Sequence, residues 1–193
     1  MNRGSFNRLV LVGLVATLLA ACVSAPKQFT GNVPVQDVSQ EAVGLINQFR
    51  ASNGLPPVIV DAALIDAARY QAVAMASANV LSHEIGGDFT ARMNSAGFVY
   101  ANAAENVGAG HSSVADAINA WIRSPHHREN MLMKDATRIG MVRADAPNSR
   151  YRNYWALDLA SAPAGSPQRI AAVKPDGKKP TASGGLFSVF LQQ

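Results

Sequence analysis

Residues 138–160 read RIGMVRADAPNSRYRNYWALDLA and decide the class of fold. Two runs within this stretch, Arg138–Ala144 and Arg150–Ala160, are rich in aromatic and branched residues and are predicted strands. Between them the segment DAPNS has the composition of a hairpin loop. Strands joined by a short loop pair antiparallel, so this stretch predicts an antiparallel hairpin late in the chain.

The chain before this hairpin has apolar residues at helical spacing. Ser39 is expected to cap a first helix and Asp61 a longer, alanine-rich one. A short helix is expected around Phe89–Ala96 and another over Ser113–Arg123, followed by a break at Ser124–Pro125. Because these helices precede and flank a late sheet, the sequence predicts an α+β fold.

Composition limits the class of protein. A chain of 193 residues with 48% hydrophobic and 16% charged residues is expected to form one compact domain.

Short strands near Phe98–Ala101 and Asn106–Val107 are expected to complete a small sheet. The net charge of +4 includes Arg3 and Arg8 near the N-terminus, and the remaining +2 is too small to predict nucleic-acid binding. A monomer is expected.

The first 22 residues, MNRGSFNRLVLVGLVATLLAAC, have the pattern of a secretory signal. The apolar run Leu9–Leu19 is short for a membrane span and is followed by mixed sequence. Leu19–Cys22 resembles a bacterial lipobox, so we expect acylation of Cys22 and attachment to a membrane. The alternative is an ordinary signal peptide with an unmodified thiol. Val23 is not the aspartate of inner-membrane retention, which favours the outer membrane, on its periplasmic or surface side, in a Gram-negative envelope.

Four regions are expected along the chain. They are a lipoprotein signal peptide at 1–21, a lipidated N-terminus and tether at 22–38, a folded domain at 39–161 and a low-complexity, disordered tail at 162–193. The apolar segment Leu186–Leu191 in that tail could pair as an edge strand, dock on a partner or have no role. Because Cys22 is the single cysteine, neither an intramolecular disulfide nor a cysteine-based zinc site can form.

The titratable side chains show no local metal-binding motif. The chain has four histidines, His83, His111, His126 and His127, and no HExxH spacing connects them. Each histidine alone is more often a surface or hydrogen-bonded residue than a ligand.

An ordered series of short segments nevertheless resembles the CAP superfamily, also called SCP-like domains, in its bacterial branch. The resemblance covers about residues 39–160. The segments that carry it are Asn47–Arg50, Gly54–Pro57, Asp61–Leu64, Ser82–His83, Phe89–Met93, Ala96–Phe98, Ala104–Val107, Trp121–Asn130, Ile139–Gly140 and Tyr154–Asp158.

This resemblance implies a three-layer α-β-α sandwich with a small, mainly antiparallel sheet. It also implies a cleft built from two histidines and two acidic residues. His83, Glu105 and His127 match three of those positions, and the interval to Gly140 favours His127 over its neighbour. The fourth position, usually a glutamate, is Ser124. Asn106, Asn130 and Ser124 are expected to line the cleft, and turn hydrogen bonding is the alternative for the two asparagines. Arg92 could pair with an acidic residue and brace the site, although bracing of the core is favoured.

Two neutral imidazoles are good ligands for zinc or a related divalent ion, and Glu105 could orient one of them, bind through water or act as a base. The alternative is a polar cleft that holds loops to the sheet. The resemblance favours an envelope-anchored binding module for a lipid, glycan or envelope protein. A metal-assisted, peptidase-like hydrolase using His83, His127 and Glu105 is the second hypothesis, and a purely structural envelope protein is the third.

Overall fold

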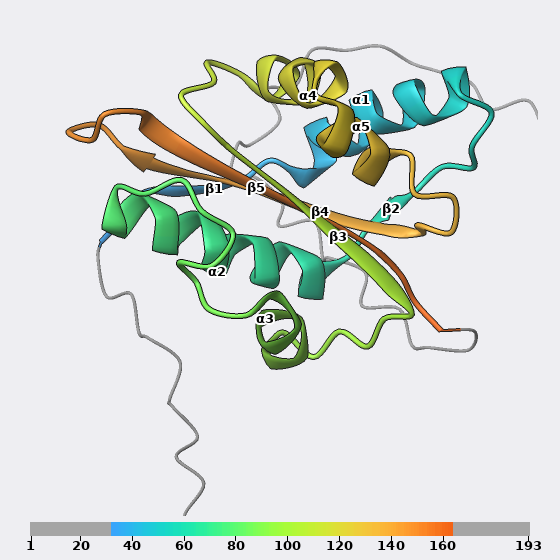
Figure 1. The fold of residues 1–193 in the computed structure, drawn as a ribbon, viewed down its shortest axis with the longest axis horizontal. Coiled ribbons are helices and arrows are strands. Elements are labelled where there is room, and N and C mark those ends of the chain that lie inside the picture. The colour runs from blue at the N-terminus through green and yellow to red at the C-terminus, as the bar shows by residue number, and fades with distance from the viewer. Residues whose placement is uncertain (1–31, 164–193) are drawn as a thin grey trace, which may run out of the picture.

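The computed structural model describes residues 32–163, which form one sheet with helices on both faces (Figure 1). The strands are β1 (Val35–Asp37), β2 (Ile59–Val60), β3 (Asn102–Ala109), β4 (Arg138–Ala146) and β5 (Arg152–Ser161). The helices are α1 (Ser39–Ser52), α2 (Ala62–Ala78), α3 (Phe89–Ser95), α4 (Val114–Arg123) and α5 (Pro125–Met131).

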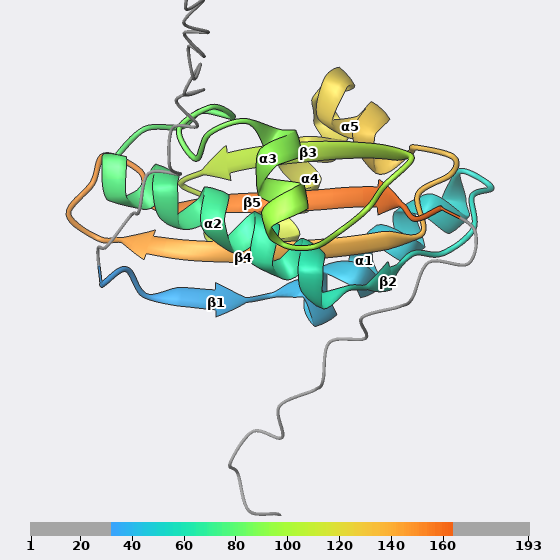
Figure 2. The same ribbon diagram turned by 90° about the horizontal axis from the view of Figure 1, so that it is seen from below.

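The sheet has the strand order β1-β4-β5-β3, with β2 beside β4 (Figure 2). The predicted hairpin is confirmed: β4 and β5 pair antiparallel from Arg138↔Ala160 to Ala146↔Arg152. β3 is antiparallel to β5 and β1 to β4, while the short β2 is parallel to β4. The mainly antiparallel sheet expected from the sequence is therefore confirmed, and β3 occupies one of its edges.

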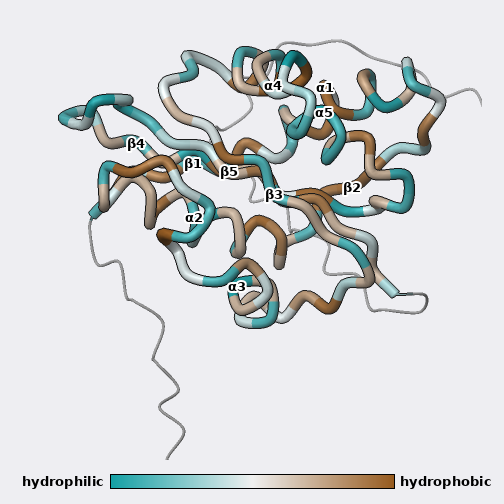
Figure 3. The backbone as a smooth tube through the Cα atoms, viewed as in Figure 1, coloured by the Kyte–Doolittle hydropathy of each residue, from teal (hydrophilic) through white to brown (hydrophobic). Residues whose placement is uncertain are grey.

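The helices divide into two layers. In Figure 1, α1, α4 and α5 cover one face of the sheet, and α2 and α3 cover the other. The first layer buries Ile46, Trp121 and Met131 against Leu157, and the second buries residues such as Ala68 and Met75 against the opposite face. Figure 3 shows the polar turn between β4 and β5 in teal, away from the apolar centre. The three-layer α+β arrangement is confirmed.

Local capping explains where several helices begin. Asp61 accepts a hydrogen bond from the Ala63 N–H at the start of α2, and Ser113 accepts one from the Asp116 N–H at the start of α4. The cap at Asp61 is as predicted, and the helix expected over Ser113–Arg123 begins at Val114, with Ser113 as its cap. Ser39 is different: it lies inside α1, and its hydroxyl bonds to the main chain of Met141 on β4 instead. The expectation that Ser39 caps the helix is therefore wrong.

Two strand expectations also need correction. The expected strands at Phe98–Ala101 and Asn106–Val107 are replaced by one strand, β3, which starts at Asn102 because its residues pair continuously with β5. The expected tether extended to Val38, but Val35–Asp37 pair with β4 as β1. Main-chain pairing at the edge of the sheet thus adds to the folded body a segment that has no periodicity of its own.

Several sequence expectations lie outside the described residues. These are the signal peptide, Cys22 and the segment Leu186–Leu191. Between residues 32 and 163, no helix is both long and apolar enough to span a bilayer.

Candidate functional site

The structure brings His83 and Glu105 into direct contact. His83 follows α2 in a loop, whereas Glu105 lies on β3. The two residues are 22 positions apart in the sequence. The His83 Nδ1 and the Glu105 Oε1 are 2.8 Å apart. The Glu105 side chain is only 4% exposed, while the imidazole of His83 is 51% exposed. The pair therefore joins a buried carboxylate to a histidine that solvent can reach.

Arg92 on α3 supports both members of this pair. Its Nη2 donates to Glu105 Oε2, and its Nη1 donates to the main-chain carbonyl of His83 at 3.1 Å. A further bond from Nη1 to the Gly87 carbonyl, at 2.6 Å, fixes the same loop. The pairing of Arg92 with an acidic residue, which the sequence offered as one possibility, is confirmed, and the acid is Glu105. Both oxygens of Glu105 are thereby engaged.

The hydrogen bond to Glu105 determines the protonation of His83. It is the main cause that raises the pKa of His83, and partial burial of the ring opposes it. At a pH above that pKa, Nδ1 keeps the proton and donates it to the carboxylate, so Nε2 carries a free lone pair. No hydrogen bond to Nε2 occurs within residues 32–163. A histidine held in this way is prepared to bind an electrophile or a metal through Nε2.

His127 lies on α5 and is half-buried, whereas His126 beside it is exposed. The His127 Nδ1 is 3.0 Å from the hydroxyl oxygen of Ser124, which occupies the position where the family pattern has a glutamate. Burial lowers the pKa of His127, and the charges of His83 and His126 lower it further. His83 is therefore one of the two charged neighbours that act on the ring of His127.

Asn106 and Asn130 connect α5 to β3. The Asn106 side chain donates to the carbonyl of His127 at 3.0 Å. Asn130 donates to the side-chain oxygen of Asn106 at 2.9 Å and to the carbonyl of Glu105 at 3.3 Å. These bonds fix the helix that carries His127 relative to the strand that carries Glu105.

The donor set fits a divalent metal only partly. Two imidazoles suit zinc, but structural zinc sites use four protein ligands and catalytic ones three. Glu105 is held by His83 and Arg92, which makes it an orienting carboxylate instead of a third ligand. In the described part of the chain, no group of three or more His, Cys, Asp or Glu residues is arranged to hold a metal. His83 and His127 are therefore the two candidate protein ligands, and solvent would fill the other positions.

Sequence reasoning missed Asp158 as a member of this cluster. It lies on β5 opposite Glu105 in the β3–β5 register and opposite Gly140 on β4. It is fully buried, and neither carboxylate oxygen has a hydrogen-bond partner within the described residues. Burial raises the pKa of Asp158 well above its ordinary value, the charge of Glu105 raises it further, and Arg92 opposes both. The sequence signal that could have identified Asp158 is that it is the single acidic residue in the apolar run YWALDLA, residues 154–160.

Replacing Asp158 with asparagine is expected to change how stability depends on pH. In the unfolded chain Asp158 loses its proton near pH 4, whereas the folded protein retains it up to the raised pKa. The unfolded state then binds fewer protons, so this group makes the wild-type protein less stable as pH rises through that window. Urea unfolding from about pH 4 to pH 7 should show the Asp158→Asn protein gaining stability relative to wild type.

Asp66→Asn is the matched control, because the Asp66 side chain is 68% exposed. Its stability difference from wild type should stay nearly constant over the same pH range. A stability difference for Asp158→Asn that does not change with pH would contradict a raised pKa for Asp158.

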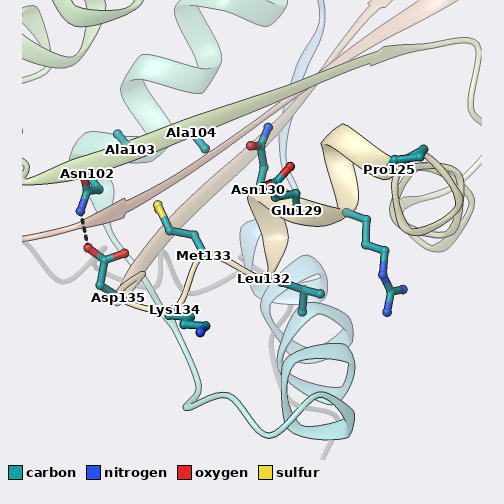
Figure 4. Close-up of a pocket in the computed structure, with 11 residues that line it drawn as sticks. Asn102, Ala103, Ala104, Pro125, Glu129, Asn130, Leu132, Met133, Lys134 and Asp135 are labelled. Atoms are coloured by element: carbon teal, nitrogen blue, oxygen red, sulfur yellow. Dashed lines mark hydrogen bonds between the residues drawn. The ribbon is translucent and has the colours of Figure 1, made fainter.

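A pocket of about 840 Å³ lies beside the site (Figure 4). It is bounded by the first residues of β3, by α5 and by the loop Leu132–Asp135. Asn130 belongs to both the pocket and the histidine network, whereas His83, Glu105 and His127 are not among the lining residues. The pocket is therefore an adjoining surface, separate from the cluster that contains the two histidines.

Comparisons with known proteins agree with the fold and with the segments described above. The family model described as CAP, the cysteine-rich secretory protein family, matches residues 43–159. A Bacillus subtilis (strain 168) protein, "Uncharacterized protein YkwD", is 32% identical over 110 residues, which are 55% of this chain and 42% of that protein.

Two solved structures share the fold. An extracellular protein containing a SCP domain from Bacillus anthracis has a TM-score of 0.56 and 25% identity, over 64% of this chain and 40% of that one. An outer surface protein from Borrelia burgdorferi has a TM-score of 0.60 and 18% identity, over 68% of this chain and 99% of that one. The chain spans less than half the length of the two Bacillus proteins.

Proposed function

The protein belongs to the CAP, or cysteine-rich secretory protein, family, and from that membership we propose that it is an extracytoplasmic binding module of a bacterial envelope. In this proposal Cys22 carries the lipid that anchors the chain. The site formed by His83, Glu105 and His127 receives the ligand, a lipid, glycan or envelope protein, and can hold a divalent metal.

The observation that carries the proposal is the bond between His83 Nδ1 and Glu105 Oε1, reinforced by Arg92. A buried carboxylate that orients a half-exposed imidazole fixes its tautomer and leaves Nε2 unprotonated, so that Nε2 can accept a ligand. A purely structural hydrogen bond does not need an exposed ring. The network is thus better suited to binding than to bracing alone.

His83 and His127 are the residues that would hold a metal such as zinc. The ion would supply a Lewis-acidic centre for an oxygen or nitrogen atom of the ligand. Glu105 orients the ring of His83 and Ser124 orients the ring of His127, in each case through the histidine Nδ1. Asn106 and Asn130 hold α5 in place. With two protein ligands, the metal is expected to exchange readily.

The geometry supports binding more strongly than hydrolysis. A metal-assisted hydrolase needs Glu105 to accept a proton from water, but both of its oxygens already accept hydrogen bonds. Ser124 cannot replace a second carboxylate as a base. We therefore propose a binding role.

The extracytoplasmic location is supported by two separate observations. The printed descriptions of the two structural neighbours are an extracellular protein and an outer surface protein. The sequence up to Cys22 has the pattern of a lipoprotein signal. Together they favour attachment to the outer side of a membrane, and to the outer membrane in a Gram-negative envelope.

Zinc affinity tests the assignment of the two histidines. In residues 23–193, the double substitution His83→Ala with His127→Ala is expected to reduce zinc affinity at least about tenfold. The wild-type affinity is also expected to fall at least about tenfold between pH 7.5 and pH 5, because protons compete for the imidazoles. Since the pKa of His83 is raised, this loss should begin above the ordinary histidine range. Isothermal titration calorimetry measures both effects.

The matched control is the protein with His111→Ala and His126→Ala, the two remaining histidines. It should bind zinc within about twofold of wild type. Equal zinc affinity in both double variants would overturn the assignment, and so would a zinc-binding protein whose affinity does not change with pH.

Substitution of Cys22 tests the anchor. In cells making the full chain, Cys22→Ala is expected to move most of the protein from the membrane fraction to the soluble fraction, or to block its processing. The reason is that the acyl chains provide the membrane affinity. Ser24→Ala, two residues away, should leave the distribution unchanged. Unchanged membrane association of the Cys22→Ala protein would contradict lipidation at this position.

A further inference from the structure

The pocket shown in Figure 4 lies along the free edge of the sheet, and we refer to it as the β3-edge groove. One wall is the start of β3 and the other is α5 with its following loop. In Figure 4, Asn102 and Asp135 are joined by a hydrogen bond at one end of the groove, and Pro125 lies at the opposite end. Its volume of about 840 Å³ is large enough for a short peptide segment.

The main chain of Ala103 is unpaired at this edge. In an antiparallel ladder, alternate residues direct both their N–H and C=O away from the partner strand. The carbonyls of Glu105 and Val107 point outward from β5, because they accept bonds from Asn130 and Trp121. Ala103 shares their alternation, and within residues 32–163 its outward N–H and C=O have no partner. An added extended segment would satisfy both groups.

The lining of the groove favours an uncharged segment. Apolar atoms come from Ala103, Ala104, Leu132 and Met133, and the charged residues are two bases and two acids. These are Arg128, Lys134, Glu129 and Asp135. Because their charges cancel, the groove offers no net attraction to a charged ligand. Its recognition chemistry is main-chain pairing next to apolar side chains.

The described chain leaves the domain beside this groove. β5 ends at Ser161, whose register partner on β3 is Asn102, a lining residue. Beyond the described residues, the sequence contains the uncharged run Leu186–Leu191, LFSVFL, which is rich in residues that favour strands. The 22 residues between Pro163 and Leu186 are enough chain to span roughly 25–30 Å. A tether of that length would give the segment a local concentration on the order of millimolar at the groove.

We propose that Leu186–Leu191 docks in the β3-edge groove of its own chain as an added strand, pairing with the main chain of Ala103. The segment follows the end of β5, which lies beside the groove, and it has no charge and is rich in residues that favour strands. These are the properties that the edge and its lining select. This inference is independent of the metal and of the lipid anchor.

Amide hydrogen exchange on residues 23–193, which contain every helix and strand of the domain, tests the docking. The substitutions Phe187→Asp and Phe190→Asp are expected to speed exchange in the peptide covering Ala103 by at least about fivefold, because an open edge amide is unprotected. Lys178→Ala with Lys179→Ala changes the net charge by the same amount and should leave the wild-type exchange rate intact. A synthetic peptide of residues 184–193 should restore slow exchange to the Phe187→Asp/Phe190→Asp protein.

Two results would overturn the proposal. One is equal exchange around Ala103 in the wild-type and Phe187→Asp/Phe190→Asp proteins. The other is protection that falls when the wild-type protein is diluted tenfold, since this would show that the segment docks on a second copy of the chain. Protection that is independent of concentration supports docking within one chain.

Discussion

The Gly140→Ala protein is expected to lose about 3 kcal/mol or more of its free energy of unfolding, a severe effect for one added methyl group. A Cβ atom at this position would lie closer than 3.0 Å to the main-chain atoms of Leu64 and Ile65 on α2. A side chain could rotate away from such an overlap, but the helix main chain must move as a unit. Urea unfolding followed by circular dichroism measures the loss.

Gly44→Ala is the matched control. Gly44 lies inside α1, and a Cβ atom there would meet nothing within 4 Å. Since alanine is the better helix former, this substitution should stabilise the protein by up to about 1 kcal/mol. Similar stability changes in the two glycine variants would show that α2 does not press on β4 as described. The contact matters for the site because α2 leads directly to the loop that carries His83.

The second large effect is expected at Arg50, where Arg50→Met should destabilise the protein by about 3–5 kcal/mol. Arg50 is fully buried on α1, and it donates to four main-chain carbonyls. The acceptors are the carbonyls of Pro56, Met131, Met133 and Ala136. Methionine fills similar space but leaves all four acceptors without this donor.

The control for Arg50 is Arg69→Met, because the Arg69 side chain is 42% exposed and its ion pair with Asp66 is long, at 4.0 Å. Its effect should lie within about 0.5 kcal/mol of zero. Thermal unfolding of both variants provides the comparison. A loss below about 1 kcal/mol for Arg50→Met would contradict the structural role of its bonds to the loop after α5.

Features that depend on neighbouring residues could be predicted from the sequence. Asp61 is a predicted cap because its side chain reaches an N–H group two residues ahead. The β4–β5 hairpin follows from two strand-forming runs joined by a short loop. By contrast, β1 forms only through its pairing with β4, about 100 residues away. The Ser39 hydroxyl donates to the Met141 carbonyl on that same strand and does not cap α1. Such distant pairings leave no local pattern.

The same distinction applies to the site. His83, Glu105 and His127 were identified by resemblance to a family, not by spacing, because they lie on a loop, a strand and a helix. The sequence also suggested Arg92 as a brace, but the register of β3 and β5 was needed to place Asp158 opposite Glu105. Asp158 is buried without a hydrogen-bond partner because of how the sheet and helices pack. The sequence alone shows only that an acidic residue lies within an apolar strand.

The most direct test of the central claim is a nitrogen-15 NMR spectrum of the four histidine side chains, recorded before and after zinc addition. The account predicts a proton on Nδ1 of His83 and none on its Nε2 above the pKa of that ring, because Nδ1–H donates to Glu105. Zinc should then shift the ring nitrogens of His83 and His127 and leave those of His111 and His126 in place. A proton on Nε2 of His83, or zinc shifts confined to His111 and His126, would contradict a ligand site built on the His83–Glu105 pair.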